Sequence, residues 1–550
     1  MNTDQILKEL KNIIQGEVSI STEDINSHKR DASIFEMTPQ IVVYPKDTKD
    51  VENLVLFVNT HKKEIQNLSI TARAAGTDMT GGTLTDSISM DVKHFNKIIE
   101  INQHNLYTIV EPGVYYRDFE KQVEAMKLVY PSYPASKNLC TFGGIVNNNS
   151  GGELSLRYGK TEKYVKRVNM VLRDGKLHTF EKISKDQLNE KMKQDDLEGE
   201  IYKRMYKLLE DNYDIIKQST PTVTKNSTGY NIWNMWDREY FDMSQVFIGA
   251  QGTLGLLTEA KVDIVQRQEK NGLLILFLKD FNNIPDIVNT VLSYNPISFE
   301  SFDNYTLKLA LKFFVSFAKL LGKNAISMPI QFFPEFLLVA LRGMPRLILL
   351  VEFDEDSDTL INQKISHLSE DLKKYKNLYF KKAQNQGEIN KYFAIRRESF
   401  NLLRNKIKNL KAASFIDDII VHPKDLTEFL PQLYEILDKE KLIYTIAGHI
   451  GDGNFHIIPL MDLKQKSERD KIFRIADTVF ELVLKYKGSI SAEHNEGLIR
   501  SPYTKEMYGD KIYEIFQEIK NIFDPDRIFN PYKKTEITKE FSYKHIIQNY

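Results

Sequence analysis

The sequence predicts a multidomain α+β protein, and three observations lead to this fold class. The chain has 550 residues, more than one hydrophobic core usually organises, so two or three domains are expected. In the first half, short β-branched runs alternate with segments of helical periodicity. From Lys270 onward the pattern changes to longer apolar runs, which indicates a separate domain built on its own sheet.

The composition is that of an ordinary globular protein and argues against several partners. Lys and Arg number 74 against 75 Asp and Glu, so no net charge favours nucleic acid. The single cysteine, Cys140, excludes an internal disulfide and a cysteine-held iron–sulfur cluster. The first residues lack the layout of a signal peptide, and no apolar run reaches the roughly 20 residues of a membrane span. We therefore expect a cytoplasmic protein, with peripheral contact at the inner face of the membrane left open.

The elements of the first half follow from the spacing of apolar residues. Helical spacing predicts helices over residues 4–14, 47–59 and 117–126, and β-branched runs predict strands over 40–45, 87–92 and 106–114.

Three polar, glycine-rich stretches adjoin these strands, at residues 69–83, 141–152 and 247–260. Glycine lets a backbone approach a ligand closely, and consecutive free N–H groups form a concave anion site. One such turn alone is usually just a turn, and none has the Walker or Rossmann spacing. Three loops together indicate one large, extended ligand that lies across a domain.

In the second half, apolar runs predict strands over 272–278 and 347–353 and a helix over 284–294. Between them, Tyr305–Gly343 is rich in Leu, Phe and Lys. Its segment Leu307–Leu321 has the pattern of a basic amphipathic helix that lies on a membrane surface. The alternative is a helix packed on its own domain with its lysines in solvent, and we favour that alternative.

A candidate metal group lies near the end of the chain. His449 and His456 bracket a Gly-Asp-Gly-Asn turn, and Glu493 follows some forty residues later, next to His494. A lone histidine is usually a core or surface residue, but a turn of this kind can bring both imidazoles to one side. With Glu493 as a hard oxygen ligand, the three residues make a zinc-like triad with open positions.

Several of these motifs together resemble a known family. Arg73–Gly82, Glu111–Val114, Gly143–Gly152 with Arg157–Gly159, and Gly252–Gly255 resemble the FAD-binding domain of flavoproteins of the vanillyl-alcohol oxidase and p-cresol methylhydroxylase (VAO/PCMH) type. With Gly448–His456, Ser491–His494 and Asp524–Pro531, the chain looks like the FAD-linked D-2-hydroxyacid dehydrogenases. The resemblance runs from about Asp31 to Pro531.

The resemblance implies a two-subdomain VAO/PCMH-type FAD-binding domain, followed by an α/β substrate (cap) domain with a helical C-terminal region. The expected boundaries are a helical extension at 1–37, the FAD-binding domain at 38–266, the substrate domain at 267–465 and, at 466–550, a helical region that completes the active site. The cofactor-binding residues carried over are Arg73, Ala74, Ala75, Gly76, Thr77, Asp78, Thr80, Pro112, Gly113, Ser136, Gly143, Gly144, Val146, Asn147, Asn148, Gly151, Gly152, Tyr158, Gly252, Gly255, Leu256 and Asn530.

The resemblance also assigns the reacting groups. It makes His449, His456 and Glu493 the ligands of a divalent metal, with zinc as the first expectation and manganese, iron and cobalt admissible. It makes His494 the base, poised near neutral pH, and Arg396 the residue that binds the substrate carboxylate.

Three departures from the family pattern qualify these expectations. Asp78 stands where covalent flavoproteins often carry a histidine, so noncovalent FAD is expected. Gln251 replaces a common glutamate, which leaves the redox tuning open. Asn495 replaces a frequent glycine and is expected to change the shape of the substrate pocket.

The implied reaction is oxidation of a D-2-hydroxy acid to the 2-oxo acid by hydride transfer to flavin N5. D-Lactate is the first expectation, with glycolate and D-2-hydroxyglutarate as alternatives. The lysine of some D-2-hydroxyglutarate enzymes has no clear counterpart near Phe415–Asp418, which counts against a dicarboxylate. No dinucleotide fingerprint is present, so electrons are expected to pass to a quinone or another external carrier. A metallohydrolase and a flavin-binding protein without catalysis are the rival hypotheses, and a homodimer is left open.

Overall fold

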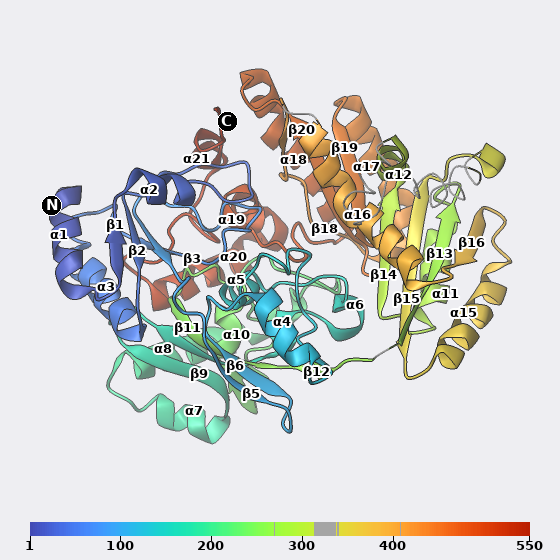
Figure 1. Ribbon diagram of the computed structural model, residues 1–550. Coiled ribbons are helices and arrows are strands. Elements are labelled where there is room, and N and C mark those ends of the chain that lie inside the picture. Colours follow the sequence, from blue (N-terminus) through green and yellow to red (C-terminus); the bar gives the residue numbers. More distant parts are fainter. Residues whose placement is uncertain (269, 313–336, 338–339, 407–408, 550) are drawn as a thin grey trace.

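The computed structural model describes residues 1–268, 270–312, 337, 340–406 and 409–549. Its elements form two lobes (Figure 1). The N-terminal half of the chain builds the first lobe, which holds two larger sheets and the two-stranded sheet β12–β7, and the segment from about residue 270 to 485 builds the second lobe, the cap, around one large sheet. The C-terminal helices return to the first lobe.

A small four-stranded sheet forms the first subdomain, with strand order β1 (Glu17–Ser19), β2 (Ile41–Tyr44), β4 (Ile88–Asp91), β3 (Ile70–Arg73). Strands β2, β4 and β3 run parallel, and β1 pairs antiparallel at the edge. Helices α1 (Thr3–Ile13) and α3 (Thr48–His61) contribute apolar side chains to its core. The first glycine-rich loop leaves the carboxyl end of β3, where ligands of open α/β sheets commonly bind.

The second subdomain is a six-stranded antiparallel sheet. Its strand order is β10 (Tyr240–Asp242), β9 (Leu177–Ser184), β8 (Val165–Val171), β11 (Leu256–Asp263), β6 (Tyr107–Val110), β5 (Ile98–Asn102). Helices α4 (Tyr116–Glu124), α8 (Leu197–Asp211) and α20 (Thr504–Phe523) pack into its core. The third glycine-rich loop ends where β11 begins. The smaller elements of this lobe are α2 (Thr22–His28), α6 (Ser155–Tyr158), η1 (Thr161–Lys163), α7 (Lys185–Lys191), α9 (Tyr213–Gln218), α10 (Ser244–Phe247), β7 (Leu128–Val129) and β12 (Val265–Gln266).

The second glycine-rich stretch differs from the loop that the sequence predicts, because part of it forms helix α5 (Phe142–Asn148). Glycine disfavours a helix interior, so the pattern gives no helix signal. Tertiary contact decides the conformation: the amide of Gly143 donates to Pro112 O at 2.7 Å. A Cβ on Gly143 would lie 2.7 Å from Pro112 Cβ, so only glycine permits this approach.

The cap is an antiparallel sheet with strand order β16 (Leu378–Lys382), β13 (Lys270–Leu278), β15 (Leu347–Glu355), β14 (Ser298–Asp303), β19 (Ile443–His449), β20 (Asn454–Met461), β17 (Lys411–Ala412), with β18 (Ile419–Ile420) also paired to β20. One face packs against α11 (Ile284–Leu292), α15 (Asp358–Leu372), α17 (Leu426–Lys439) and α18 (Lys466–Lys485). The other face packs against α12 (Asn304–Lys312) and α16 (Gln386–Lys406). The short helix η2 (Pro423–Asp425) precedes α17.

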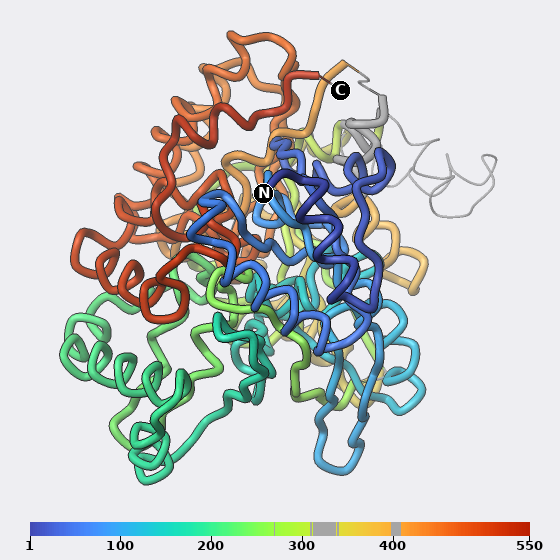
Figure 2. The backbone as a smooth tube through the Cα atoms, turned by 90° about the vertical axis from the view of Figure 1, so that its left-hand side faces the viewer, coloured from blue at the N-terminus to red at the C-terminus, as the bar shows by residue number. Residues whose placement is uncertain are grey.

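The end of the chain ties the lobes together. After α18, the short helices α19 (Gly497–Arg500) and η3 (Ser501–Tyr503) lead into α20 on the first lobe, and Ile528 and Phe529 enter the core of the first subdomain. Beyond α21 (Lys539–Lys544), the amide of Ile547 donates to Ile34 O at 2.9 Å. Figure 2 shows this C-terminal stretch crossing toward the N-terminal residues.

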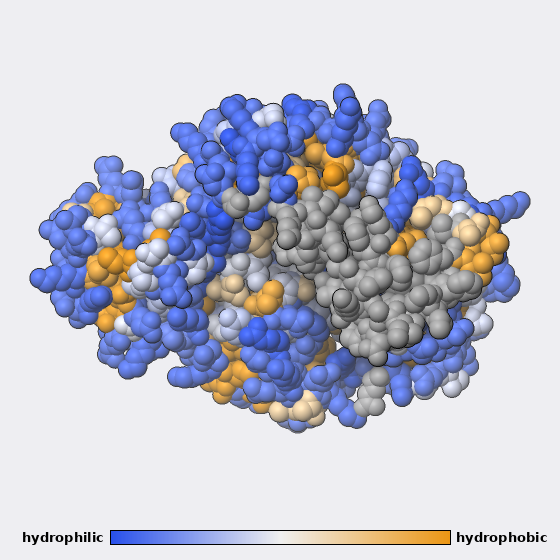
Figure 3. All heavy atoms as spheres, turned by 45° about the horizontal axis from the view of Figure 1, so that its top comes forward, coloured by the Kyte–Doolittle hydropathy of each residue, from blue (hydrophilic) through white to orange (hydrophobic). Residues whose placement is uncertain are grey.

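The structure confirms the helices and strands predicted above within a few residues of their ends. The segment Leu307–Leu321 lies largely outside the described residues, and so does most of Tyr305–Gly343. Among the helices that the structure does describe, none combines the length and the apolar character needed to cross a membrane. The coloured part of the face in Figure 3 is mainly hydrophilic, with hydrophobic residues in separate patches.

We predict that Gly453→Ala destabilises the protein because the turn between β19 and β20 requires glycine. Gly453 has φ +77°, and a Cβ there would lie 1.9 Å from Val421 O. The matched control is Gly343→Ala, since Gly343 has φ +82° with no atom within 4 Å of the added carbon. Both replacements carry the left-handed backbone penalty, and the clash should add about 1–3 kcal/mol to the loss for Gly453→Ala. Equal shifts of the urea midpoint for both variants would contradict this.

Candidate active site

The β19–β20 hairpin places two histidines on one face of the cap sheet. Its register pairs Ala447 with His456 and His449 with Asn454. Residues opposite each other share a face, as do residues two apart on one strand. His449 and His456 therefore project to the same side, and their ring centroids lie 5.3 Å apart.

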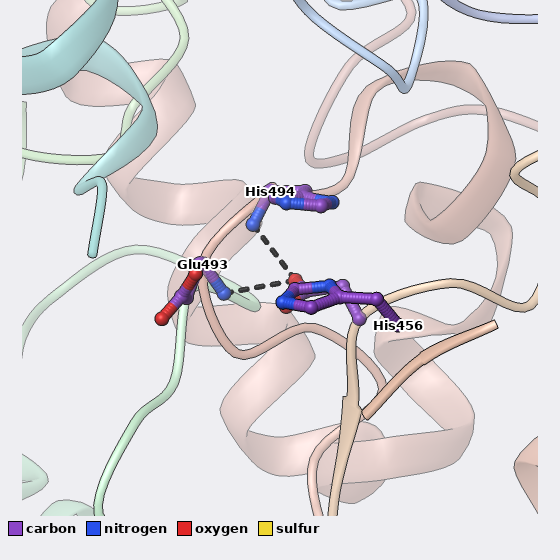
Figure 4. A group of neighbouring side chains, drawn as sticks. His456, Glu493 and His494 are labelled. Atoms are coloured by element: carbon purple, nitrogen blue, oxygen red, sulfur yellow. Dashed lines mark hydrogen bonds between the residues drawn. The ribbon is translucent and has the colours of Figure 1, made fainter. Parts of the chain in front are cut away.

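The segment from Ser489 to Glu496 brings Glu493 and His494 against this hairpin. Asp418 holds the segment: its Oδ2 accepts the backbone amides of Glu493 at 2.8 Å and His494 at 2.7 Å, and the hydroxyl of Ser491 at 2.9 Å. Figure 4 shows the two backbone bonds converging. The His494 ring lies nearly parallel to that of His456, with centroids 4.9 Å apart.

Buried carboxylates orient the three imidazoles. His494 Nδ1 donates to Asp417 Oδ2 at 2.8 Å, and His449 Nδ1 donates to Glu300 Oε1 at 2.7 Å. His456 Nδ1 lies 3.3 Å from Asp417 Oδ1. Each ring thus turns Nδ1 toward a carboxylate, which leaves Nε2 as the ligand atom. Metal-binding histidines in proteins are commonly oriented in this way.

Four side chains can offer ligand atoms that all lie within 4.8 Å of one another: Asp418, His456, Glu493 and His494. His449 stands beside this group, with Nε2 at 3.5 Å from Glu493 Oε2. The compact group therefore differs from the predicted trio, because it contains Asp418 and His494 while His449 is adjacent. Imidazole nitrogens and carboxylate oxygens are donors that suit zinc, manganese, iron and cobalt, so these residues fit a divalent metal.

The charges around His494 change the expectation of a base poised near neutral pH. Burial by itself would lower the pKa of His494, but the carboxylates of Asp418 and Asp417 raise it to about 9. Without a further cation nearby, the imidazole keeps its proton at neutral pH. Burial disfavours the charged form of Glu493, yet the ammonium of Lys225 and the imidazole of His449 bring the Glu493 pKa well below its ordinary value.

Lys225 was not predicted, and it stands at the centre of the buried charges. Its Nζ lies 2.6 Å from Glu493 Oε1 and 3.0 Å from Asp452 Oδ2, and all three side chains are at most 5% exposed. Burial would lower the pKa of Lys225, but Asp452 and Glu493 raise it above its ordinary value. No local pattern around Lys225 signals this role, because its partners are more than two hundred residues away.

Arg396 projects from α16 beside the same group. It forms a buried ion pair with Glu300, and one of its terminal nitrogens lies 3.5 Å from His449 Nδ1. Its Nε is buried without a hydrogen-bond partner. Arg396 is also one of the residues that line the cavity described next.

A cavity of about 1030 Å³ joins this group to the glycine-rich loops. Its volume is at the upper end of the roughly 300–1,000 Å³ typical of cofactor sites. The predicted site residues that line it are Arg73, Ala74, Ala75, Gly76, Thr77, Asp78, Pro112, Ser136, Gly143, Gly144, Asn147, Asn148, Gly151, Gly252, Gly255, Arg396, His449, His456, Glu493 and His494. A Cβ on Gly144 or Gly252 would meet no protein atom closer than 3.9 Å, so these glycines leave room for a ligand such as FAD.

The other predicted cofactor residues lie behind this wall. Val146 and Leu256 are core residues, Tyr158 lies at the end of α6, and Gly113 lines a neighbouring 250 Å³ cavity. The remaining three residues make local contacts. The Thr80 hydroxyl donates to Asp78, and Asn530 Nδ2 donates to Gly82 O and Gln251 O. A Cβ on Gly152 would lie 2.1 Å from Tyr133 O. They shape the loops rather than the cavity surface.

The structure also places the two unusual residues. Gln251 lines the cavity, and its Oε1 accepts the amide of Gly497 at 2.9 Å. Asn495 is fully buried and does not line the cavity. Its Nδ2 donates to Gly249 O at 2.8 Å and to Asn148 O at 3.2 Å. Asn495 therefore adds no surface of its own to the cavity; its amide ties the His494 segment to the second and third glycine-rich stretches.

Comparison with known proteins matches two parts of the chain to family models. Residues 39–181 match the sequence model of an FAD binding domain, and residues 267–534 match that of the FAD linked oxidases, C-terminal domain. The chain therefore combines an FAD-binding domain with a C-terminal domain of the FAD-linked oxidase type. The fold of 4-ethylphenol oxidase from Gulosibacter chungangensis is similar, with a TM-score of 0.68 at 14% identity over 98% of both chains. This confirms the predicted α+β fold with a VAO/PCMH-type FAD-binding domain.

Two relatives of the chain have named activities. A D-2-hydroxyglutarate dehydrogenase of Pseudomonas putida is 28% identical over 97% of this chain and 52% of the relative. A D-lactate dehydrogenase of Anaerostipes hadrus is 24% identical over 96% of this chain and 97% of the relative. The chain spans about half the length of the Pseudomonas protein and of several similar dehydrogenases.

We predict that Lys225→Met strongly destabilises the protein. The replacement leaves the Glu493 and Asp452 carboxylates buried without their ammonium partner, which should cost about 3–5 kcal/mol. Adding Glu493→Gln should restore part of that loss, because one of the two uncompensated charges is removed. Chemical denaturation monitored by circular dichroism measures both effects.

The control is Lys207→Met, which breaks the exposed Lys207–Asp211 pair and should change stability little. A Lys225→Met protein as stable as the control would show that the buried ion pairs are not a structural requirement.

Proposed function

We propose that the protein is an FAD-dependent dehydrogenase that oxidises a D-2-hydroxy acid to the corresponding 2-oxo acid. The observation that carries the proposal is the continuous cavity, which is lined at one side by the glycine-rich loops and at the other by the histidine and carboxylate group. The names of the two relatives, a D-2-hydroxyglutarate and a D-lactate dehydrogenase, support this class of substrate.

The glycine-rich loops hold FAD noncovalently. Their backbone amides and glycines, from Arg73 to Asp78 and from Gly143 to Asn148, form the part of the wall that suits a pyrophosphate. When bound, FAD supplies the hydride acceptor for the substrate carbon. The loop around Gln251 and Gly252 completes this side of the cavity.

A divalent metal fits His456 and Glu493 of the compact group, with His449 and Asp418 alongside, while His494 stays unligated and serves as the base. Zinc is the first expectation, and manganese, iron and cobalt suit the same donors. Such a cation would supply a Lewis acid for the oxygens of a hydroxy acid. Its positive charge would also lower the pKa of a neighbouring imidazole.

The residues of the chain bind the acid and move its proton. Arg396, which lines the cavity beside His449, receives the substrate carboxylate in a charge-assisted hydrogen bond. His494 accepts the proton of the 2-hydroxyl, and Asp417 stabilises the resulting imidazolium through Nδ1. The electrons leave the protein through an external quinone or another carrier.

A metallohydrolase built on the same histidines would leave the flavin half of the cavity without a role. The match to an FAD binding domain therefore favours the dehydrogenase over this alternative.

The proposal predicts that D-2-hydroxy acids bleach the flavin absorbance of the purified protein without oxygen. His494→Ala should retain FAD but slow this reduction by about 10²–10⁴-fold, because the hydroxyl proton loses its acceptor. His104→Ala, which removes an exposed histidine, should leave the rate unchanged. A protein without flavin bands after addition of FAD would overturn the dehydrogenase, and an unaltered rate in His494→Ala would remove this residue as the base.

Metal removal provides a separate prediction. Treatment with a chelator should abolish substrate-dependent bleaching while the flavin spectrum remains, because metal ligands and flavin loops are different residues. Addition of Zn²⁺, Mn²⁺ or Co²⁺ should restore the rate and identify the preferred ion. Full activity in a preparation shown by elemental analysis to lack metal would contradict a metal at this site.

A further inference from the structure

The cavity continues past the histidines along the β19–β20 hairpin. The cross-strand pair Thr445–Ile458 lies next to the pair Ala447–His456 in the register, and all four residues line the cavity. Residues two apart on a strand project to the same face and lie roughly 7 Å apart. Thr445 and Ile458 thus form a wall one step beyond the proposed reaction centre.

Two further uncharged residues of the cap line the cavity. Thr306 of α12 and Ala412 of β17 belong to its lining. Thr306 and Thr445 are buried, and the Thr306 hydroxyl already donates to Asp303 at 2.8 Å. We call Thr306, Ala412, Thr445, Ala447 and Ile458 the hairpin wall.

The cations that line the cavity from the described part of the cap are Arg396 and Arg397, and both face acids. Arg396 is paired with Glu300 next to His449. Arg397 is paired with Glu153 of the first lobe. One guanidinium is therefore close to the histidine group, as needed for the carboxylate at carbon 1, and the hairpin wall itself carries no cation.

We propose that the hairpin wall is the subsite for the substrate side chain and that it selects short aliphatic 2-hydroxy acids of four to six carbons over dicarboxylates. This inference rests on the proposed function and deepens it. A second carboxylate placed against Ile458 and Ala447 would lose its hydration without gaining a cation from the described residues of this wall. An aliphatic chain would gain contact there, and the methyl group of lactate would leave most of the wall uncovered.

The test compares anaerobic bleaching of the holoenzyme flavin by D-lactate, D-2-hydroxyvalerate and D-2-hydroxyglutarate. We expect the apparent second-order rate constant for D-2-hydroxyvalerate to exceed that for D-lactate at least about 10-fold, since added methylenes gain contact in an apolar pocket. The rate constant for D-2-hydroxyvalerate should also exceed the rate constant for D-2-hydroxyglutarate by about 100-fold or more. Equal or faster reduction by D-2-hydroxyglutarate would overturn the inference and leave the proposed function standing. Bleaching by none of the three acids would overturn both.

A pair of variants tests the position of the subsite. Ile458→Lys should raise the ratio of the rate with D-2-hydroxyglutarate to that with D-2-hydroxyvalerate at least about 10-fold, because the new ammonium can pair with the second carboxylate. Ile443→Lys adds the same charge to the same hairpin at a residue that is 48% exposed and outside the cavity, and it should not change the ratio. The same ratio of rates in both variants would show that the side chain of the substrate binds elsewhere. If Ile458→Lys does not fold, the substrate series with the unaltered protein decides the specificity.

Discussion

The neighbouring aspartates Asp417 and Asp418 hold the candidate active site together. Asp418 accepts two backbone amides and the Ser491 hydroxyl, so it sets the path of the segment that carries Glu493 and His494. Asp417 faces the Nδ1 atoms of both His456 and His494. A buried carboxylate must be satisfied by such donors. The two side chains therefore hold the β19–β20 hairpin and the segment with Glu493 and His494 in fixed positions relative to each other.

The site also concentrates negative charge that the protein only partly compensates. Asp417, Asp418, Asp452, Glu300 and Glu493 are all buried. Lys225 and Arg396 pair with three of these carboxylates. The other two, Asp417 and Asp418, raise the pKa of His494. Such an excess of carboxylates suits a divalent cation, which is consistent with the proposed metal and with an acid substrate that enters beside Arg396.

Neither lobe can form the site alone. The first lobe contributes the glycine-rich loops and Lys225, the cap contributes the hairpin and Arg396, and the C-terminal segment contributes Glu493 and His494. Asn495 ties that segment to the loops of the first lobe. The cofactor space and the proposed reaction centre are thus assembled by the same packing that seats α20 on the first lobe.

The sequence by itself determined what local patterns encode. Apolar spacing predicted the helices and strands named in the sequence analysis, glycine-rich stretches marked the expected cofactor loops, and a Gly-Asp-Gly-Asn turn put His449 and His456 on one side. Tertiary structure decided the partners of these residues, because a pairing across long separations leaves no local pattern. Glu300 lies 149 residues from His449, and Lys225 lies 268 residues from Glu493. Asp418 as a candidate ligand, the shifted pKa of His494 and the uncharged hairpin wall all arise from such contacts.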